Sequence, residues 1–202
     1  MKRILAFSAA VLAAVALLAG CSSKKAEYVV LDEALSDEVY AIGFRKGDQT
    51  LRDAVQQALV ELKKEGKAAE ISNTWFGEDI TTIPDQFTPT ESSDDSLAKV
   101  KEKGEFILGL DDSFPPMGYD DNGEIVGFDI DLAKAVCEKL GVKLKLQPIN
   151  WDQNVSELNG GNIDCIWNGM SVDPERAAAM NLSVTKCFLG LNAESLTVVT
   201  WT

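Results

Sequence analysis

The chain has 202 residues, 19 Lys and Arg against 32 Asp and Glu, no histidine, and a formal net charge of −13. This charge disfavours nucleic acids and anionic lipid surfaces as partners, because both would repel it. Without histidine there is no imidazole base or imidazole metal ligand, so binding is favoured over catalysis, and no metal or other cofactor is expected.

The N-terminus predicts export. Lys2 and Arg3 precede an apolar run, Ile4 to Leu18, that is too short for a membrane span, and Ala-Gly then leads into Cys21. This pattern resembles bacterial lipoprotein precursors, which implies a signal peptide over residues 1–20 and diacylation of Cys21. Two acyl chains would anchor the protein outside the cytoplasm, on the bacterial cell membrane. An ordinary cleaved signal with a chance cysteine is the alternative.

The other cysteines, Cys137, Cys165 and Cys187, are odd in number and lack metal-type spacing. A disulfide framework is therefore not expected, and the first two are predicted to be buried thiols.

Two helices are predicted before residue 78. Asp48 is a plausible N-cap for a helix that ends at Gly66, and a second, shorter helix runs to Trp75. The apolar face of the first helix has no partner within its own segment; it carries Leu51, Val55, Leu59 and Leu62. Residues 78–95 are rich in Thr, Pro, Ser and Asp and predict a linker outside the core.

Strands alternate with helices after the linker. This order predicts βαβ units and a mainly parallel sheet flanked by helices, an α/β fold. The expected elements are a helix over Ser96 to Lys103, a strand over Glu105 to Leu110, a turn at Asn122-Gly123, a helix over Asp129 to Leu140, a strand over Lys143 to Gln147, a short helix over Asp152 to Leu158 and a strand over Ile163 to Trp167.

A ligand site is predicted beyond the carboxyl ends of these strands, where sites form in open α/β sheets. The first strand is followed by Asp111 and Phe114, the second by Trp151, and the third by Asn168, Gly169 and Ser171. Arg176 lies about one turn into a helix that begins at Asp173-Pro174, and its planar fork suits a carboxylate.

These residues combine groups that would bind an anion, aromatic rings that would form a wall, and a carboxylate that would accept hydrogen bonds. Together they are the complement of a small zwitterion such as a polar amino acid. Each also has a structural interpretation. Arg176 could pair with Glu175 or Asp173, Asp111 could be a turn residue, and the aromatic rings could belong to the core.

Three motifs make a resemblance specific: Gly109-Leu-Asp-Asp-Ser-Phe-Pro-Pro-Met117, Gly123-Glu-Ile-Val-Gly-Phe-Asp-Ile-Asp-Leu-Ala133, and Ile163-Asp-Cys-Ile-Trp-Asn-Gly-Met-Ser-Val-Asp-Pro-Glu-Arg176. They resemble the first lobe of the family 3 substrate-binding proteins of amino-acid ABC transporters, which have a type II periplasmic-binding-protein-like fold. The resemblance implies that Arg176, helped by Ser171, clamps the ligand's α-carboxylate, and that Asp111 contacts its side chain. It also implies stacking on Phe114 and Trp151, and contacts from Asn168 and Gly169.

The order of the segments along this chain differs from their order in that family. Residues 39–77 resemble the C-terminal segment of its first lobe, with a strand near Tyr40 to Phe44, yet they precede residues 96–183, which resemble the beginning of that lobe. The chain is thus expected to be a circularly permuted first lobe. Residues 21–38 would be the anchor and a remnant of the second-lobe exit, and 184–202 a divergent tail, with most of the second lobe missing.

The resemblance implies a lipid-anchored protein that captures an amino acid and delivers it to an ABC transporter permease. A truncated fragment with little binding, or a regulatory binding module, is the alternative. A periplasmic enzyme of the same fold is disfavoured by the lack of histidine.

Overall fold

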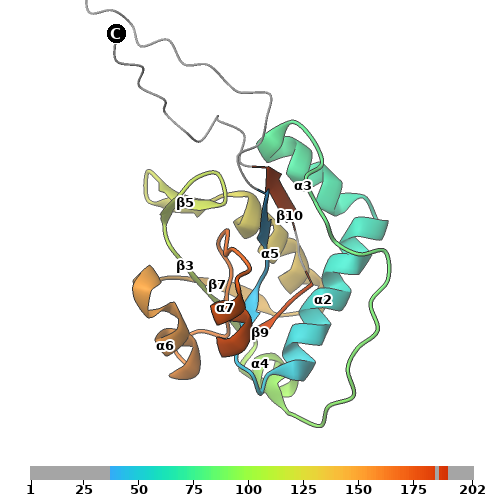
Figure 1. Ribbon diagram of the computed structural model, residues 1–202, viewed down its shortest axis with the longest axis vertical. Helices are drawn as coiled ribbons and strands as arrows, with labels where there is room; N and C mark the ends of the chain where they lie inside the picture. The colour runs from blue at the N-terminus through green and yellow to red at the C-terminus, as the bar shows by residue number, and fades with distance from the viewer. Residues whose placement is uncertain (1–36, 185–186, 191–202) are drawn as a thin grey trace, which may run out of the picture. The chain divides into compact units, whose positions relative to one another are not determined.

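The computed structural model describes residues 37–184 and 187–190 (Figure 1). The predicted signal peptide at 1–20, the acylation site Cys21 and most of the predicted tail lie outside the described residues. The described residues belong to one folded unit. None of their helices has both the length and the hydropathy needed to cross a membrane.

A five-stranded sheet with the order β7-β3-β8-β2-β9 forms the centre of this unit. Its strands are β2 (Gly43–Phe44), β3 (Glu105–Leu110), β7 (Lys143–Pro148), β8 (Cys165–Ile166) and β9 (Asn181–Leu182). β3 pairs in parallel with β7 and β8, whereas β2 is antiparallel to both β8 and β9. The predicted α/β class is confirmed, with a mixed sheet in which the parallel part is β7-β3-β8.

The strand expected at residues 40–44 is inserted in the sheet built by the later block, as predicted, but it is shorter. Its pairing is interrupted because neighbouring backbone groups bond elsewhere. Ala41 N–H donates to the Met170 carbonyl oxygen at 3.0 Å, and Ile42 N–H donates to Ser183 Oγ at 2.9 Å. Tyr40, the first residue of the predicted strand, belongs to another pair, in which β1 (Asp37–Tyr40) runs antiparallel to β10 (Cys187–Gly190).

A small antiparallel sheet lies between β3 and the next helix along the chain. It contains β4 (Ser113–Phe114), β5 (Gly118–Asp121) and β6 (Glu124–Val126). The turn between β5 and β6 is at Asn122 and Gly123, which have φ of 58° and 94°. Both residue types tolerate positive φ, so the predicted turn is confirmed.

The helices follow the predicted order. They are α2 (Gln49–Lys64), α3 (Lys67–Phe76), α4 (Ser96–Lys103), α5 (Phe128–Leu140), the 3₁₀ turn η1 (Trp151–Gln153), α6 (Asn154–Asn159) and α7 (Pro174–Ala179). The predicted apolar face of α2 is fully buried, and α2 packs against α3, α4 and α5. Helices of the first block therefore cover the sheet of the second (Figure 1).

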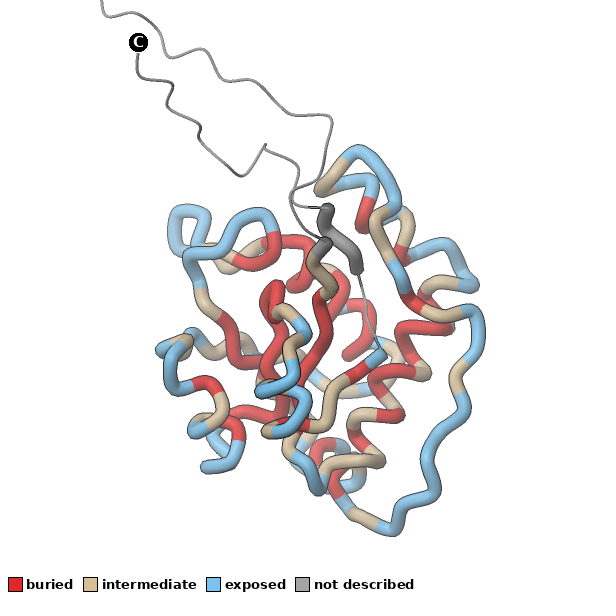
Figure 2. Tube along the Cα trace, in the orientation of Figure 1, coloured by how far each residue is buried: buried red, intermediate tan, exposed pale blue. Residues whose placement is uncertain are grey.

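Side-chain alternation along the strands divides the interior into two clusters. Phe106 and Leu108 of β3 face the larger cluster, which α2 and α5 cover, whereas Ile107 faces the smaller one. Cys165 and Ile166 of β8 alternate in the same way. The smaller cluster is completed by residues of α6 and α7, so helices lie on both faces of the sheet. Figure 2 shows the interior strands as buried, and β2 and β8 are buried at every position, whereas the edge strand β7 has no fully buried residue.

The segment 78–95 is largely irregular, as predicted, but the prediction that it lies outside the core is wrong at Ile83, which is 1% exposed. Thr90 N–H donates to Asp53 Oδ2 on α2 at 2.7 Å, and the Arg52 guanidinium lies 5.2 Å from the centre of the Phe87 ring. The segment 78–95 therefore packs along α2.

The predicted buried thiols are confirmed for Cys137 and Cys165. Burial raises the pKa of Cys137 to about 12 and that of Cys165 well above its usual range. Both thiols therefore stay protonated and act as small apolar groups. The side chain of Cys187 lies outside the described part.

Asp94 joins the two blocks by capping two helices. Its carboxylate accepts from Thr50 N–H at 2.9 Å, in the first turn of α2, and from Ser96 N–H at 3.0 Å, in the first turn of α4. The hydroxyls of Thr50 and Ser96 donate to it as well. Burial opposes ionisation, but these hydrogen bonds outweigh it and hold the pKa of Asp94 well below its ordinary value.

We expect Asp94→Ala to lower the free energy of unfolding by about 1 to 2 kcal/mol at neutral pH, because two helix starts lose their cap. A depressed pKa stabilises the fold above the ordinary value of 3.8, and this contribution is lost as the pH falls below it. Urea unfolding at pH values from neutral to acid should therefore show the difference between wild type and variant shrinking on acidification.

The matched control is Asp95→Ala, because Asp95 is exposed and its side chain pairs with Lys99 on the surface. It should change stability by under about 1 kcal/mol. Equal effects of the two substitutions would contradict the capping role of Asp94.

Candidate functional site

The loop after β8 is fixed by a buried carboxylate. Asp129, in the first turn of α5, accepts a hydrogen bond from Trp167 Nε1 at 3.0 Å and another from Gly169 N–H at 2.7 Å. Its side chain is fully buried, and its negative charge lies at the N-terminal end of a helix, where the helix dipole stabilises it. The beginning of α5 therefore determines the direction of the loop.

Gly169 allows the aromatic ring of Phe114 to pack directly on the loop backbone. Its φ of 52° is in the left-handed region, and a Cβ built on it would lie 2.5 Å from Phe114 Cε1. A side chain at this position would be strained and would displace the ring. Phe114 remains 41% exposed, so one side of its ring is accessible as a stacking surface.

Asn168 acts as a brace between two segments. With its amide oriented to satisfy both neighbours, it donates to the Asp111 carbonyl oxygen at 3.0 Å and accepts from Gly118 N–H at 3.2 Å. The Asp111 carboxylate accepts from Ser113 N–H at 2.9 Å and from Ser113 Oγ at 2.6 Å. Asp111 therefore has the turn geometry that was its structural interpretation, and Asn168 is buried.

Arg176 reaches back from α7 to the loop. Its Nη1 donates to the Ser171 carbonyl oxygen at 2.8 Å, and its Nε lies 3.4 Å from Asp173 Oδ2. Asp173 caps α7 by accepting from Arg176 N–H at 2.8 Å. The expected pairing with Asp173 is present, and the same guanidinium is held against Ser171. A guanidinium has five N–H donors, so these contacts leave others for a ligand.

A residue that the sequence did not suggest, Glu38, contacts Ser171. The Ser171 hydroxyl donates to one carboxylate oxygen of Glu38, and the Tyr40 hydroxyl donates to the other at 2.9 Å. Tyr40 and Ser171 also form a β-bridge. Glu38 and Ser171 are 133 positions apart, and no local pattern could have indicated the contact.

The structure thus brings six of the seven predicted site residues together in pairs along one loop. The pairs are Asn168 with the Asp111 backbone, Gly169 with Phe114, and Ser171 with Arg176. Trp151 is half-buried and packs against the smaller apolar cluster. Whether these residues contact a ligand stays a prediction.

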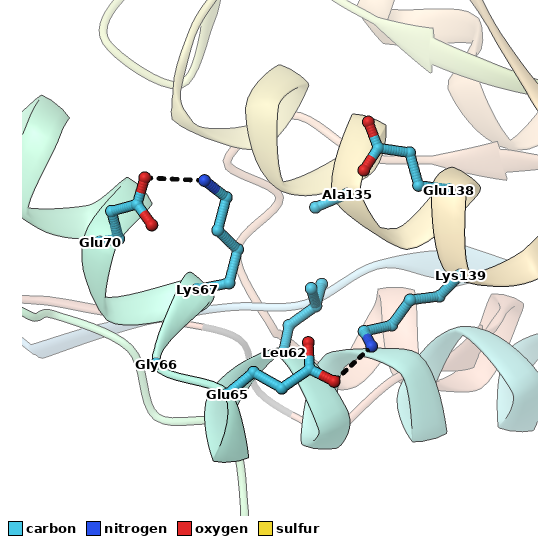
Figure 3. A pocket seen from close by; sticks show the side chains of 8 residues that line it. All are labelled: Leu62, Glu65, Gly66, Lys67, Glu70, Ala135, Glu138 and Lys139. Carbon is cyan, nitrogen blue, oxygen red and sulfur yellow. Dashed lines mark hydrogen bonds and ion pairs between the residues drawn. The ribbon is translucent and has the colours of Figure 1, made fainter.

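A separate hollow of about 530 Å³ lies between α2, α3 and α5 (Figure 3). None of the predicted site residues lines it. Its charged groups largely pair with one another: Lys67 lies 2.7 Å from Glu70, and Lys139 lies 2.8 Å from Glu65. These ammonium and carboxylate groups therefore already have partners within the chain.

No group of three or more Cys, Asp or Glu residues within the described ranges is arranged to hold a metal ion.

Comparison with known proteins finds a family for most of the chain. The sequence profile of bacterial extracellular solute-binding proteins, family 3, matches residues 2–78 and 106–191. The L-cystine-binding protein TcyJ of Escherichia coli (strain K12) is 32% identical over 98 residues, which are 48% of this chain and 37% of that protein. The probable ABC transporter arginine-binding protein ArtJ of Chlamydia trachomatis is 40% identical over 72 residues, 35% of this chain and 28% of that protein.

Among solved structures, an ABC uptake transporter substrate-binding protein from Streptococcus pneumoniae with bound histidine is 44% identical. The match covers 44% of this chain and 36% of that one, with a TM-score of 0.42. The chain spans about a third of the length of the curated relatives it matches, between 28% and 37% in the two above.

We expect Asp129→Asn to destabilise the protein by about 1.5 to 3 kcal/mol, because Trp167 and Gly169 donate to different carboxylate oxygens and the substitution replaces one of these oxygens with an NH2 donor. Chemical denaturation would measure the change. Asp131→Asn is the matched control on the same helix, since Asp131 is partly exposed and an amide oxygen can still accept from Trp75 Nε1. Equal losses in the two variants would contradict the role of Asp129.

Proposed function

This chain belongs to the bacterial extracellular solute-binding proteins of family 3, and from that premise we propose that it captures a polar amino acid for an ABC transporter permease. Its α/β lobe has the type II periplasmic-binding-protein-like fold. The observation that carries the proposal is the placement of Arg176 against Ser171 at the carboxyl ends of the parallel strands. Arg176 would bind the ligand's α-carboxylate there.

The remaining predicted site residues would supply the other contacts to a zwitterion. Phe114 would stack on the ligand, because one side of its ring is exposed. Trp151 would form a second wall, and Asp111 would face a polar or basic side chain. Asn168 and Gly169 would act mainly by positioning, since the Asn168 amide and the Gly169 N–H already have partners within the chain.

The order of the two matched segments supports a rearranged first lobe. Residues 39–77 supply β2, which lies between β8 and β9, and α2, which covers the sheet of residues 96–183. A circular permutation of one lobe, with 78–95 as the connection, is the proposed origin of this order.

A fragment with little binding is the second candidate. One observation favours it. The Ser171 hydroxyl and the Gly169 N–H already donate hydrogen bonds to carboxylates of the chain, which leaves fewer donors for a ligand. Catalysis is not proposed, because the family is one of binding proteins and the chain has no histidine.

The family is extracellular, and anchoring through Cys21 is our finer proposal. Lys2 and Arg3, the apolar run after them and the small residues before Cys21 support it. Two acyl chains would hold the protein near the permease.

Arg176→Ala should abolish amino-acid binding measured by isothermal titration with a panel of the common amino acids. Arg176→Lys should weaken it nearly as much, because an ammonium lacks the planar fork. The wild type should bind its best ligand in the region of about 1 mM, since Phe114 and Arg176 are partly exposed and water screens the ion pair.

Arg52→Lys is a suitable control, because Arg52 contacts Asp53, Phe87 and the Leu182 carbonyl rather than the proposed site. It should leave affinity unchanged. Tight binding that survives Arg176→Ala would show that the ligand binds elsewhere.

Labelled palmitate supplied to producing cells should be incorporated into the wild type and not into Cys21→Ser, because acylation requires the thiol. Cys187→Ser is the control and should remain labelled. Recovery of the wild type in the soluble fraction without detergent would contradict the anchor.

A further inference from the structure

Three exposed residues, 91–93, lie between two fixed points of the connection 78–95. On one side, Thr90 N–H donates to Asp53 Oδ2 of α2 at 2.7 Å, and on the other side Asp94 caps α2 and α4. Within the described part of the chain, the hydrogen bonds of residues 91–93 go only to Asp94. Residues 91–93 can therefore leave the surface without breaking a hydrogen bond to either block.

This stretch contains a glutamate whose following peptide bond a protease can reach. A protease binds its substrate in an extended form, so a bond within a helix or a paired strand must first be freed by local unfolding. Among the glutamates that the structure describes, only Glu78 and Glu91 lie outside helices, strands and helix caps. The Glu78 carbonyl oxygen accepts from Ser72 Oγ at 2.8 Å, and Ile80 N–H donates to the same hydroxyl at 2.9 Å. The bond after Glu78 is therefore held against α3, whereas the bond after Glu91 is not.

The two blocks hold each other without help from residues 91–93. β2 of the first block is hydrogen-bonded between β8 and β9 of the second. Arg45 Nη1 donates to the carbonyl oxygens of Leu158 at 2.9 Å and Ile163 at 2.6 Å. Trp75 Nε1 donates to Asp131 Oδ2 at 3.0 Å, and the buried apolar face of α2 packs against α4 and α5. A break in the connection would remove none of these contacts.

We propose that the Glu91–Ser92 bond is a processing site for an endoprotease that cleaves after glutamate, and that the cleaved chain remains one folded unit of two fragments. Hydrolysis adds water across the C–N bond, which leaves a carboxylate on Glu91 and an ammonium on Ser92. Both groups form on exposed residues, so neither charge has to be buried. The new ammonium is two positions from the Asp94 carboxylate, whose negative charge favours it. This site is separate from the proposed ligand site and does not depend on it.

Limited digestion of the full chain with a glutamate-specific serine endoprotease, followed by mass spectrometry of the fragments, tests the site. Within residues 37–184 the first cleavage should follow Glu91. Cleavage after Glu78 should be at least about tenfold slower, because two hydrogen bonds must first be broken there.

Glu91→Gln should block the first cleavage. Glu78→Gln is the matched control in the same connection and should be cleaved like the wild type. First cleavage at another glutamate of residues 37–184, or unchanged cleavage of Glu91→Gln, would overturn the assignment.

Gel filtration of the cleaved protein tests whether the two fragments stay together. They should elute as one species without denaturant and separate in urea. Because the fragments are no longer covalently joined, the thermal midpoint of the cleaved protein should rise with its concentration, whereas that of the intact chain should not change. Asp94→Ala should lower the midpoint of the cleaved protein at a fixed concentration, since Asp94 in one fragment caps α2 in the other. Aggregation or separate elution of the fragments without denaturant would overturn the proposal that they remain one unit.

Discussion

The Asp129 carboxylate holds the loop on which the proposed site is built. It accepts hydrogen bonds from Trp167 Nε1 and from Gly169 N–H, one on each oxygen, and it lies at the positive end of the α5 dipole. A buried charge is costly unless it is paired or hydrogen-bonded, so this arrangement is stable only when the loop after β8 takes one path. That path brings Gly169 under Phe114 and leads on to Ser171 and Arg176.

The two blocks of the chain depend on each other for the same site. The second block supplies the parallel strands and Arg176, whereas the first supplies β2, the covering helix α2 and Glu38. Asp94 connects them by capping α2 and α4 together. The segment between the blocks packs along α2, so their docking is defined by specific contacts as well as by apolar burial.

Elements with strong local signals were predictable from the sequence. Gly104 and Gly141 end α4 and α5 in left-handed conformations, and the apolar face of α2 has a regular helical period. Among the seven residues of the predicted site, the structure shows three contacting pairs, and their role as a ligand site stays a prediction.

Contacts between distant segments were not predictable. Ile83 lies in a polar, irregular stretch, and only its neighbours in the fold make it part of the core. The Asp111 carboxylate turns toward Ser113 because that partner is two residues away, a local competition that strand position does not reveal. Glu38 approaches Ser171 through the pairing of β1, which has no signal near Ser171 in the sequence.

The central claim is that an amino acid binds at the loop after β8. Titration of isotope-labelled protein with L-arginine and L-glutamine, followed by amide chemical shifts, tests it most directly. The account predicts that the largest changes occur at Gly169, Ser171 and Arg176. Changes confined to Lys67, Glu70 and Glu138, which line the hollow between α2, α3 and α5, would contradict it.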